Sequence, residues 1–157
     1  MRKRVVEQDG QKDSEADYNW LNLERLAQAE ISSEAEGYPV ESALIPKADS
    51  YWQAANAGEQ TIRLLFDSPQ KISLIRLLFK EEHQERTQEF VLRWSPDGVT
   101  FHDIARQQYN FSMPDSTLEL EGYSVDLDGV VALELRIIPN ISGGDARASL
   151  AEWRIAA

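Results

Sequence analysis

The segment at residues 89–101 constrains the fold more than any other part of the chain. Phe90, Leu92 and Trp94 alternate there with a second set of side chains. This two-residue period is typical of a β-strand with one buried face. The Ser-Pro-Asp-Gly sequence at 95–98 favours a tight turn, because proline fixes one turn dihedral and glycine readily takes a positive φ. A β-branched and aromatic run follows at 99–104, so the segment predicts a β-hairpin and an all-β domain.

The size and composition of the chain restrict its partners. Its 157 residues suffice for one domain with its own core. The 16 Lys and Arg residues against 27 Asp and Glu give a net charge of −11, which disfavours nucleic acid and anionic membranes as partners. The absence of cysteine excludes disulfides and thiolate sites. Because no apolar run is long enough for a signal peptide or a membrane span, we expect a cytoplasmic protein.

Further patterns divide the chain into a lead-in and one domain. Residues 1–19 are polar and aperiodic, which predicts a flexible lead-in before a domain at 20–157. Trp20, Leu23 and Leu26 recur at helical spacing, which predicts a short helix with Asp17 as its N-cap. Apolar or alternating runs predict strands at 28–33, 62–67, 72–79, 123–128, 131–137 and 149–155. With the hairpin, these make about eight strands, as in a double-sheet sandwich or jelly roll.

The connections between these strands differ in length. If successive strands run antiparallel, every second connection lies at the same end of the sandwich. Short turns at 67–70, 95–98 and 128–129 then share one end, with Asp128-Gly129 a strong hairpin signal. The opposite end collects the long connections, at 35–58, 80–88, 107–117 and 140–147. Because binding sites usually lie on loops held by a rigid scaffold, we expect the site at the long-connection end.

Residues 94–101 resemble the strand-turn-strand signature of the discoidin, or coagulation factor type C, domains. Motifs at 32–34, 41–44, 51–53, 62–67 and 150–153 follow in the order that this family shows. The resemblance covers approximately residues 23–155. It implies a galactose-binding-like β-sandwich, a fold that mostly binds sugars, lipid head groups or proteins and is seldom catalytic.

The resemblance also implies expectations about a bound metal ion and about the kind of partner. Many relatives bind a structural calcium with an Asp-Gly pair in the first long loop, where this chain has Leu44, Ile45 and Pro46. Glu152 matches a C-terminal acidic position of such sites, and Asp49 or Ser50 can add oxygens. We expect no cofactor, with a structural Ca²⁺ held by Asp49 and Glu152 as the alternative, because an oxygen cage needs several converging ligands. The sequence at 51–53 is similar to the Doc-type subunit of the anaphase-promoting complex, which implies a protein partner as the alternative to a sugar.

The candidate ligand site combines aromatic platforms with hydrogen-bonding side chains from the long connections. Trp52 is either a stacking platform or a buried anchor of its loop. Arg147, in a Gly-Gly loop, either binds ligand or pairs with Asp145 or Glu152. The residues predicted to contact the ligand are Tyr51, Trp52, Arg86, Asn110, Phe111 and Arg147.

Residues that would support catalysis do not form a recognisable set. The two histidines are His83, in a charged connection typical of a solvated hairpin end, and His102, at the short-turn end. The sequence lacks a Gly-rich phosphate loop and a histidine-based zinc spacing. We therefore expect a non-catalytic domain that binds a carbohydrate or another small polar ligand, with an intracellular protein-interaction module as the alternative. A concave polar pocket favours the first function, and a flat apolar patch favours the second.

Overall fold

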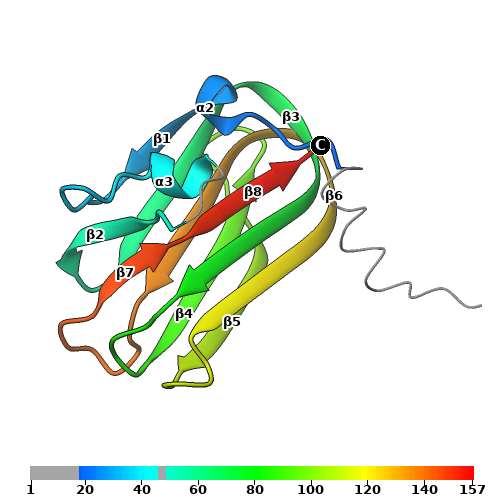
Figure 1. The fold of residues 1–157 in the computed structure, drawn as a ribbon. Helices are drawn as coiled ribbons and strands as arrows, with labels where there is room; N and C mark the ends of the chain where they lie inside the picture. Colours follow the sequence, from blue (N-terminus) through cyan, green and yellow to red (C-terminus); the bar gives the residue numbers. More distant parts are fainter. Residues whose placement is uncertain (1–17, 46–48) are drawn as a thin grey trace, which may run out of the picture.

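The computed structural model describes residues 18–45 and 49–157, so most of the predicted lead-in, and the predicted cap Asp17, lie outside the described residues. None of the described helices is long and apolar enough to cross a membrane. The fold is all-β, as predicted, with eight strands and two short helices (Figure 1). The elements in chain order are α2 (Leu23–Leu26), β1 (Ala27–Ile31), α3 (Glu41–Leu44), β2 (Trp52–Ala57), β3 (Gln60–Lys80), β4 (Arg86–Ser95), β5 (His102–Phe111), β6 (Leu118–Ile138), β7 (Arg147–Leu150) and β8 (Glu152–Ala156).

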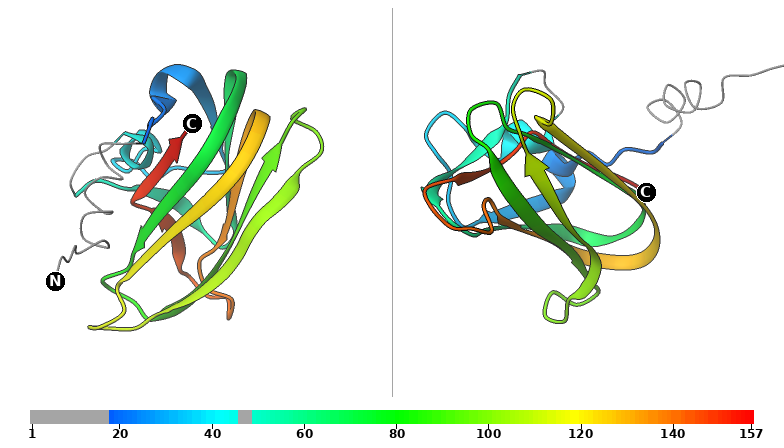
Figure 2. Two further views of the ribbon diagram at one scale, coloured as in Figure 1. Left: turned by 90° about the vertical axis from the view of Figure 1, so that its right-hand side faces the viewer. Right: turned by 90° about the horizontal axis from the view of Figure 1, so that it is seen from below.

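Two long strands, β3 and β6, form the frame of the sandwich. They pair antiparallel along their whole length, from Gln60 opposite Ile137 to Lys80 opposite Leu118. Both strands bend in the middle and continue on the other side of the molecule (Figure 2). Before its bend, β3 pairs with β1 on one side and with β6 on the other, and this part of β6 also pairs with β4. After its bend, β3 pairs with β6 and β8. Each of the two strands therefore belongs to both layers.

The segments at 67–70 and 128–129 do not separate two strands, so the prediction of turns there is wrong. Both segments lie inside continuous strands, at the place where the β3–β6 register shifts between Leu65 and Leu74. Because the two strands bend together, their ladder resumes beyond the corner, and Gly129 takes the positive φ of +66° that the bend requires. The turn signals marked a corner of the sandwich rather than a hairpin.

The turn at 95–98 is confirmed and is held by two side chains. The Ser95 hydroxyl oxygen accepts the amide hydrogens of Asp97 and Gly98, at 3.2 and 2.7 Å. Asp97 Oδ1 in turn accepts those of Val99 and Thr100, at 2.8 and 2.7 Å. Hydrogen bonds from the Thr100 and Val99 amides lower the pKa of the Asp97 carboxyl.

The long connections gather at one end, as expected. Lys80 pairs with Leu118, which places the β3–β4 and β5–β6 connections side by side, and the Glu81 amide donates to the Thr117 carbonyl. The Ile141 amide donates to the Thr87 carbonyl, which brings the β6–β7 connection to the same end. These connections are shorter than predicted, because β5 continues to Phe111 and the 35–58 segment contains α3 and β2.

The core lies between the two layers and is closed by α2 and α3. The Phe79 and Phe90 rings, one from each layer, stack with centroids 5.1 Å apart. The predicted helix is present but shorter, and its N-cap is Asn22, whose side chain accepts the Arg25 amide. The largest fully buried side chains are those of Trp52, Trp153, Phe79, Phe90, Phe111, Ile62, Leu64, Ile72, Ile75, Leu77, Leu92 and Leu133.

Candidate functional site

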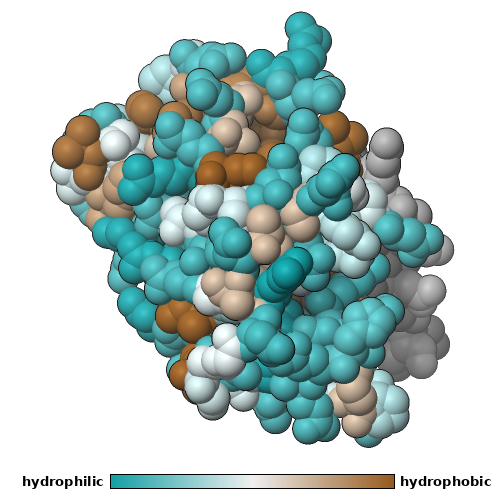
Figure 3. Space-filling model, turned by 90° about the vertical axis from the view of Figure 1, so that its left-hand side faces the viewer, coloured by the Kyte–Doolittle hydropathy of each residue, from teal (hydrophilic) through white to brown (hydrophobic). Residues whose placement is uncertain are grey.

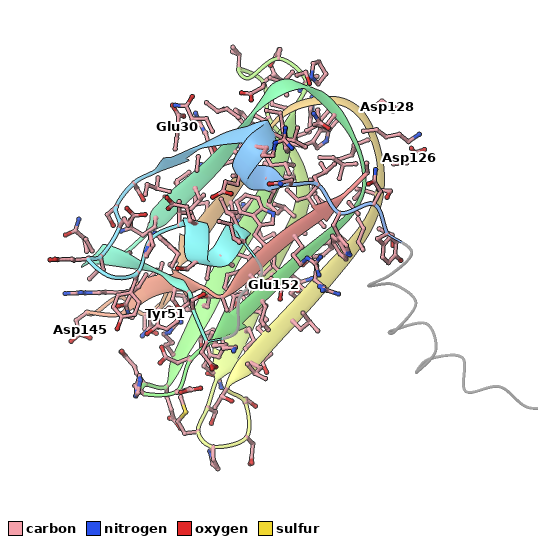
Figure 4. The ribbon with its side chains drawn as sticks, turned by 45° about the horizontal axis from the view of Figure 1, so that its top comes forward. Glu30, Tyr51, Asp126, Asp128, Asp145 and Glu152 are labelled. Atoms are coloured by element: carbon pink, nitrogen blue, oxygen red, sulfur yellow. The ribbon has the colours of Figure 1, made fainter. Side chains whose placement is uncertain are left out.

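A pocket of about 270 Å³ opens at the long-connection end of the sandwich. Three segments form it: residues 49–53 at the start of β2, residues 80–83 after β3, and residues 147–151 in and after β7. Figure 4 shows Tyr51 at the same end of the molecule as Asp145, with Asp126 and Asp128 at the opposite end. The lining residues are Asp49, Ser50, Tyr51, Gln53, Lys80, Glu81, Glu82, His83, Arg147, Ser149 and Ala151.

Strand pairing brings the first and third segments together. Gln53 lies opposite Ser149 in the antiparallel β2–β7 ladder, and both line the pocket. Because side chains alternate along a strand, Tyr51 and Gln53 face the pocket while Trp52 faces the core. Trp52 has no exposed surface, and its indole nitrogen donates to the Ser33 carbonyl at 3.1 Å. The prediction of Trp52 as a stacking platform is wrong, and its alternative as a buried anchor is correct.

Tyr51 supplies the aromatic surface of the pocket. Its ring lies against that of Tyr38, with centroids 4.9 Å apart and planes inclined by 35°. Tyr38 is 38% exposed, so the aromatic surface continues from the pocket to the solvent. Burial and a hydrogen bond with Tyr38 raise the pKa of the Tyr51 hydroxyl, which is therefore protonated at neutral pH.

Charged side chains of both signs surround this aromatic ring. Lys80, His83 and Arg147 supply donors, and three carboxylates, those of Asp49, Glu81 and Glu82, supply acceptors. Arg147 is exposed, and no ion pair joins it to Asp145 or Glu152 in the part of the chain that the structure describes. The Ser50 hydroxyl also lacks a partner among the described residues. The pocket therefore offers donors and acceptors to a ligand that is rich in hydroxyl groups.

Arg86 lies behind the pocket rather than in it. Its side chain is buried, and its Nε donates to Glu81 Oε1 at 2.6 Å. Glu81 Oε2 accepts the His83 amide at 3.0 Å. Burial alone would raise the pKa of Glu81, but the hydrogen bonds from Arg86 and His83 outweigh it and lower this pKa. The prediction that Arg86 contacts ligand is wrong, because its guanidinium holds the pocket wall from inside.

Asn110 and Phe111 lie outside the pocket lining. Phe111 is fully buried beneath the Arg86 guanidinium, 4.8 Å from the ring centroid. Asn110 is exposed on β5, where its Oδ1 accepts a hydrogen bond from the Thr87 hydroxyl at 3.1 Å. The predicted site therefore separates into Tyr51 and Arg147 in the pocket, Trp52 and Arg86 behind it, and Asn110 and Phe111 apart from it.

The polar pocket residues that the sequence did not single out are Gln53, Lys80, Glu81, Glu82, His83 and Ser149. The charged run after β3 is typical of a solvated hairpin end, and its place among the long connections is the signal that it also carries site residues. Gln53 and Ser149 gave no signal, because only the β2–β7 pairing brings them together.

The two candidate calcium ligands lie in different surroundings. Asp49 lines the pocket, whereas the Glu152 carboxylate pairs with Arg76 at 3.4 Å and Arg154 at 3.8 Å. Within residues 18–45 and 49–157, no three His, Asp or Glu side chains are grouped so that they could hold a metal ion. Calcium also takes backbone carbonyls as ligands, so the expectation about a structural ion stays a prediction.

Comparisons with known proteins agree with this architecture. The sequence model of the F5/8 type C domain matches residues 28–153. No curated protein matches the chain. The fold is similar to that of the family 32 carbohydrate-binding module (CBM32) of NanJ from Clostridium perfringens, solved with galactose, at 15% identity and a TM-score of 0.67, over 88% of this chain and 98% of that one.

Two further solved structures show the same fold. One is CpGH89CBM32-5 from Clostridium perfringens with GalNAc-β-1,3-galactose, at 19% identity and a TM-score of 0.66, over 88% of this chain and all of that one. The other is the CBM32 of AlyQ with 4,5-unsaturated mannuronic acid, at 17% identity and a TM-score of 0.60, over 83% of this chain and 94% of that one. The sequence match spans most of the chain and the architecture agrees with it, so the protein belongs to the F5/8 type C domain family.

Proposed function

We propose that this protein is a non-catalytic domain that binds a carbohydrate in the pocket between β2, β7 and the end of β3. The observation that carries the proposal is the composition of the pocket wall, in which the Tyr51 ring lies among side chains that donate and accept hydrogen bonds. An aromatic face matches the C–H face of a sugar ring, and the polar groups match its hydroxyls. Solved neighbours with bound galactose and mannuronic acid support the same ligand class.

The volume and exposure of the pocket limit the ligand. About 270 Å³ lies just below the range of about 300–1,000 Å³ that drug-sized ligands occupy, which favours a ligand of about one sugar ring inside the pocket. The exposed Arg147 guanidinium can donate two parallel hydrogen bonds, either to neighbouring hydroxyls or to a sugar carboxylate. We expect Tyr51 to contact the ring face and Arg147 to set its orientation.

A glycan array followed by calorimetry tests this proposal. The array should contain neutral galactosides and uronic acids, and a hit should bind the wild-type protein in solution. We expect Tyr51→Ala and Arg147→Ala each to weaken binding by about tenfold or more, which is the loss of one good contact. The matched control is Arg106→Ala, an exposed arginine on β5 outside the pocket lining, which should bind normally. A folded protein that binds no sugar on the array contradicts the proposal.

A protein-interaction module is the second candidate, and one surface favours it. Leu118 and Leu120 on β6 are 53% and 63% exposed, and Leu120 lies opposite Leu78 of β3 in the ladder. The exposed apolar surface of Leu118 and Leu120 is small, however. A different face of the molecule, which carries β1, β2 and β7, is mainly hydrophilic with scattered apolar side chains (Figure 3). Recovery of a protein partner by the wild type but not by Leu120→Ser, together with a silent glycan array, would favour this candidate.

A further inference from the structure

A line of side chains connects the pocket wall to the interior of the sandwich. It begins at Glu81, which accepts from Arg86 Nε at 2.6 Å. Arg86 Nη1 donates to Gln88 Oε1 at 3.1 Å and to the Pro139 carbonyl at 2.8 Å. Gln88 Nε2 donates to Glu119 Oε1 at 3.1 Å. Arg86, Gln88 and Glu119 are 3%, 0% and 1% exposed, so only the Glu81 end of the line reaches the pocket.

The charges along this line balance only if Glu119 keeps a proton. Arg86 carries one positive charge, and the nearest carboxylate, that of Glu81, already neutralises it. A second buried anion at Glu119 would be costly. Burial, followed by the effect of the neighbouring Glu121 carboxylate, raises the pKa of Glu119 to about 8, against the opposing effects of Gln88 and Arg86. Glu119 is therefore mostly protonated at neutral pH.

The groups around Glu119 come from three further strands besides its own. From β6 itself Glu121 and Tyr123 lie beside it. Burial, followed by the charges of the Glu121 and Glu119 carboxylates, raises the pKa of Tyr123 to about 12. Arg86 and the uncharged Gln88 come from β4, and Phe79 lies opposite on β3. On β5, Tyr109 lies opposite Gln88. Arg86 is thus the cation that acts on Glu119 among the described residues.

Two atoms in this cluster have unused hydrogen-bonding capacity. Arg86 Nη2 and Glu119 Oε2 are both buried, and neither has a partner among the described residues. Arg86 Nη2 is a donor, Glu119 Oε2 becomes an acceptor when the carboxyl is ionised, and the Gln88 amide already links the two side chains. An ionised Glu119 would therefore find a free donor on the same guanidinium that holds Glu81.

We propose that Arg86 is a positioning residue for the pocket wall at residues 81–83, and that the proton on Glu119 controls how firmly Arg86 holds Glu81. When Glu119 releases its proton to solvent, Arg86 is shared between two carboxylates, and its 2.6 Å contact with Glu81 weakens. Glu81 then orders the His83 amide less well, and the side chains of Glu82 and His83 lose their fixed position in the pocket.

The first test needs no ligand. The Nε–Hε resonance of Arg86 reports its bond to Glu81 and can be followed by ¹H–¹⁵N NMR from pH 6 to 9.5. We expect one titration step near pH 8 in the wild-type protein, and no such step in Glu119→Gln, which keeps the shape of the side chain but cannot ionise. The control Glu30→Gln, on the exposed face of β1, should keep the step. An Arg86 resonance that does not move in the wild type, or that moves equally in Glu119→Gln, overturns the proposal.

The second test concerns binding and rests on the proposed function. With a sugar identified on the array, we expect the wild-type Kd to rise by about threefold or more between pH 7 and 9, and the Glu119→Gln Kd to stay constant. Failure of the two proposals is distinguishable. A normal Arg86 titration without sugar binding contradicts the proposed function alone. Sugar binding with no difference in pH profile between the two proteins contradicts the positioning role of Arg86.

Discussion

Glu119 should make the stability of this protein depend strongly on pH. In the folded state its pKa is about 8, against an ordinary value of 4.5. Between these values the folded protein keeps a proton that the unfolded chain releases, so the free energy of unfolding falls as the pH rises. The contribution is complete below the unfolded pKa and is lost as the pH rises through the folded one. Glu119→Gln has no proton to lose and should escape this decline.

The size of the effect follows from the two pKa values. Their interval of about 3.5 pH units corresponds to on the order of 5 kcal/mol at most, at about 1.4 kcal/mol for each unit. The burial of Glu119, only 1% exposed, justifies the use of the full interval as an upper bound. Small domains have a total stability of about 5–15 kcal/mol, so ionisation of this one carboxyl at high pH would remove a large share of it.

Urea unfolding of both proteins at pH 5, 7 and 9 measures this difference. The fully buried Trp52 and Trp153 provide the fluorescence signal. The free energy of unfolding of the wild type is subtracted from that of Glu119→Gln at each pH. This difference should become more positive by a few kcal/mol from pH 5 to pH 9. Glu30→Gln, which removes an exposed carboxylate, should run parallel to the wild type. Parallel curves for Glu119→Gln and the wild type would refute the reasoning.

Three further substitutions test the frame of the domain. Trp52→Ala removes a fully buried indole and its bond to the Ser33 carbonyl, and should lower the free energy of unfolding by about 3–5 kcal/mol in urea titrations, with Trp52→Phe losing less. Gly98→Ala meets no atom within 4 Å but must keep a φ of +80°, so backbone strain alone should cost about 1 kcal/mol, measured as a lower Tm. Glu134→Ala leaves the guanidiniums of Arg63 and Arg93 without their shared buried carboxylate, and should cost about 2 kcal/mol or more, a loss that Arg63→Ala in the same background should partly reverse.

The alternation of apolar residues predicted the strands because each strand has one buried face. Leu133, Leu135 and Ile137 are all fully buried, as their pattern indicates. Turn chemistry was less informative. Gly98 and Gly129 follow the same kind of signal, but one lies in a hairpin and the other in a bend within β6. The difference arises because β3 bends beside β6, and a pairing between distant segments is not visible in a local pattern.

The end of the sandwich that carries the pocket could be predicted from connection lengths, whereas the side chains that line it could not. Tyr51 and Trp52 are neighbours in an aromatic pair, and the sequence does not say which of the two faces the core. The β2–β7 register decides this, because it turns Trp52 inward and leaves Tyr51 at the pocket. The sequence pattern of Arg86 is also compatible with a contact to ligand, but its side chain is buried because it lies at the start of a central strand.

The bends of β3 and β6 have a consequence for the motions of the molecule. Because both strands pass from one layer to the other at the same end, hydrogen-bonded strands join the layers there, whereas at the pocket end the layers are joined by the loops that follow β3, β5 and β6. We therefore expect amide hydrogen exchange to be slower in the strands beside the bends than in the loops at the pocket end. A sugar that contacts β7 and the end of β3 together would stabilise these segments, so binding should slow exchange first at the pocket end, far from the bends.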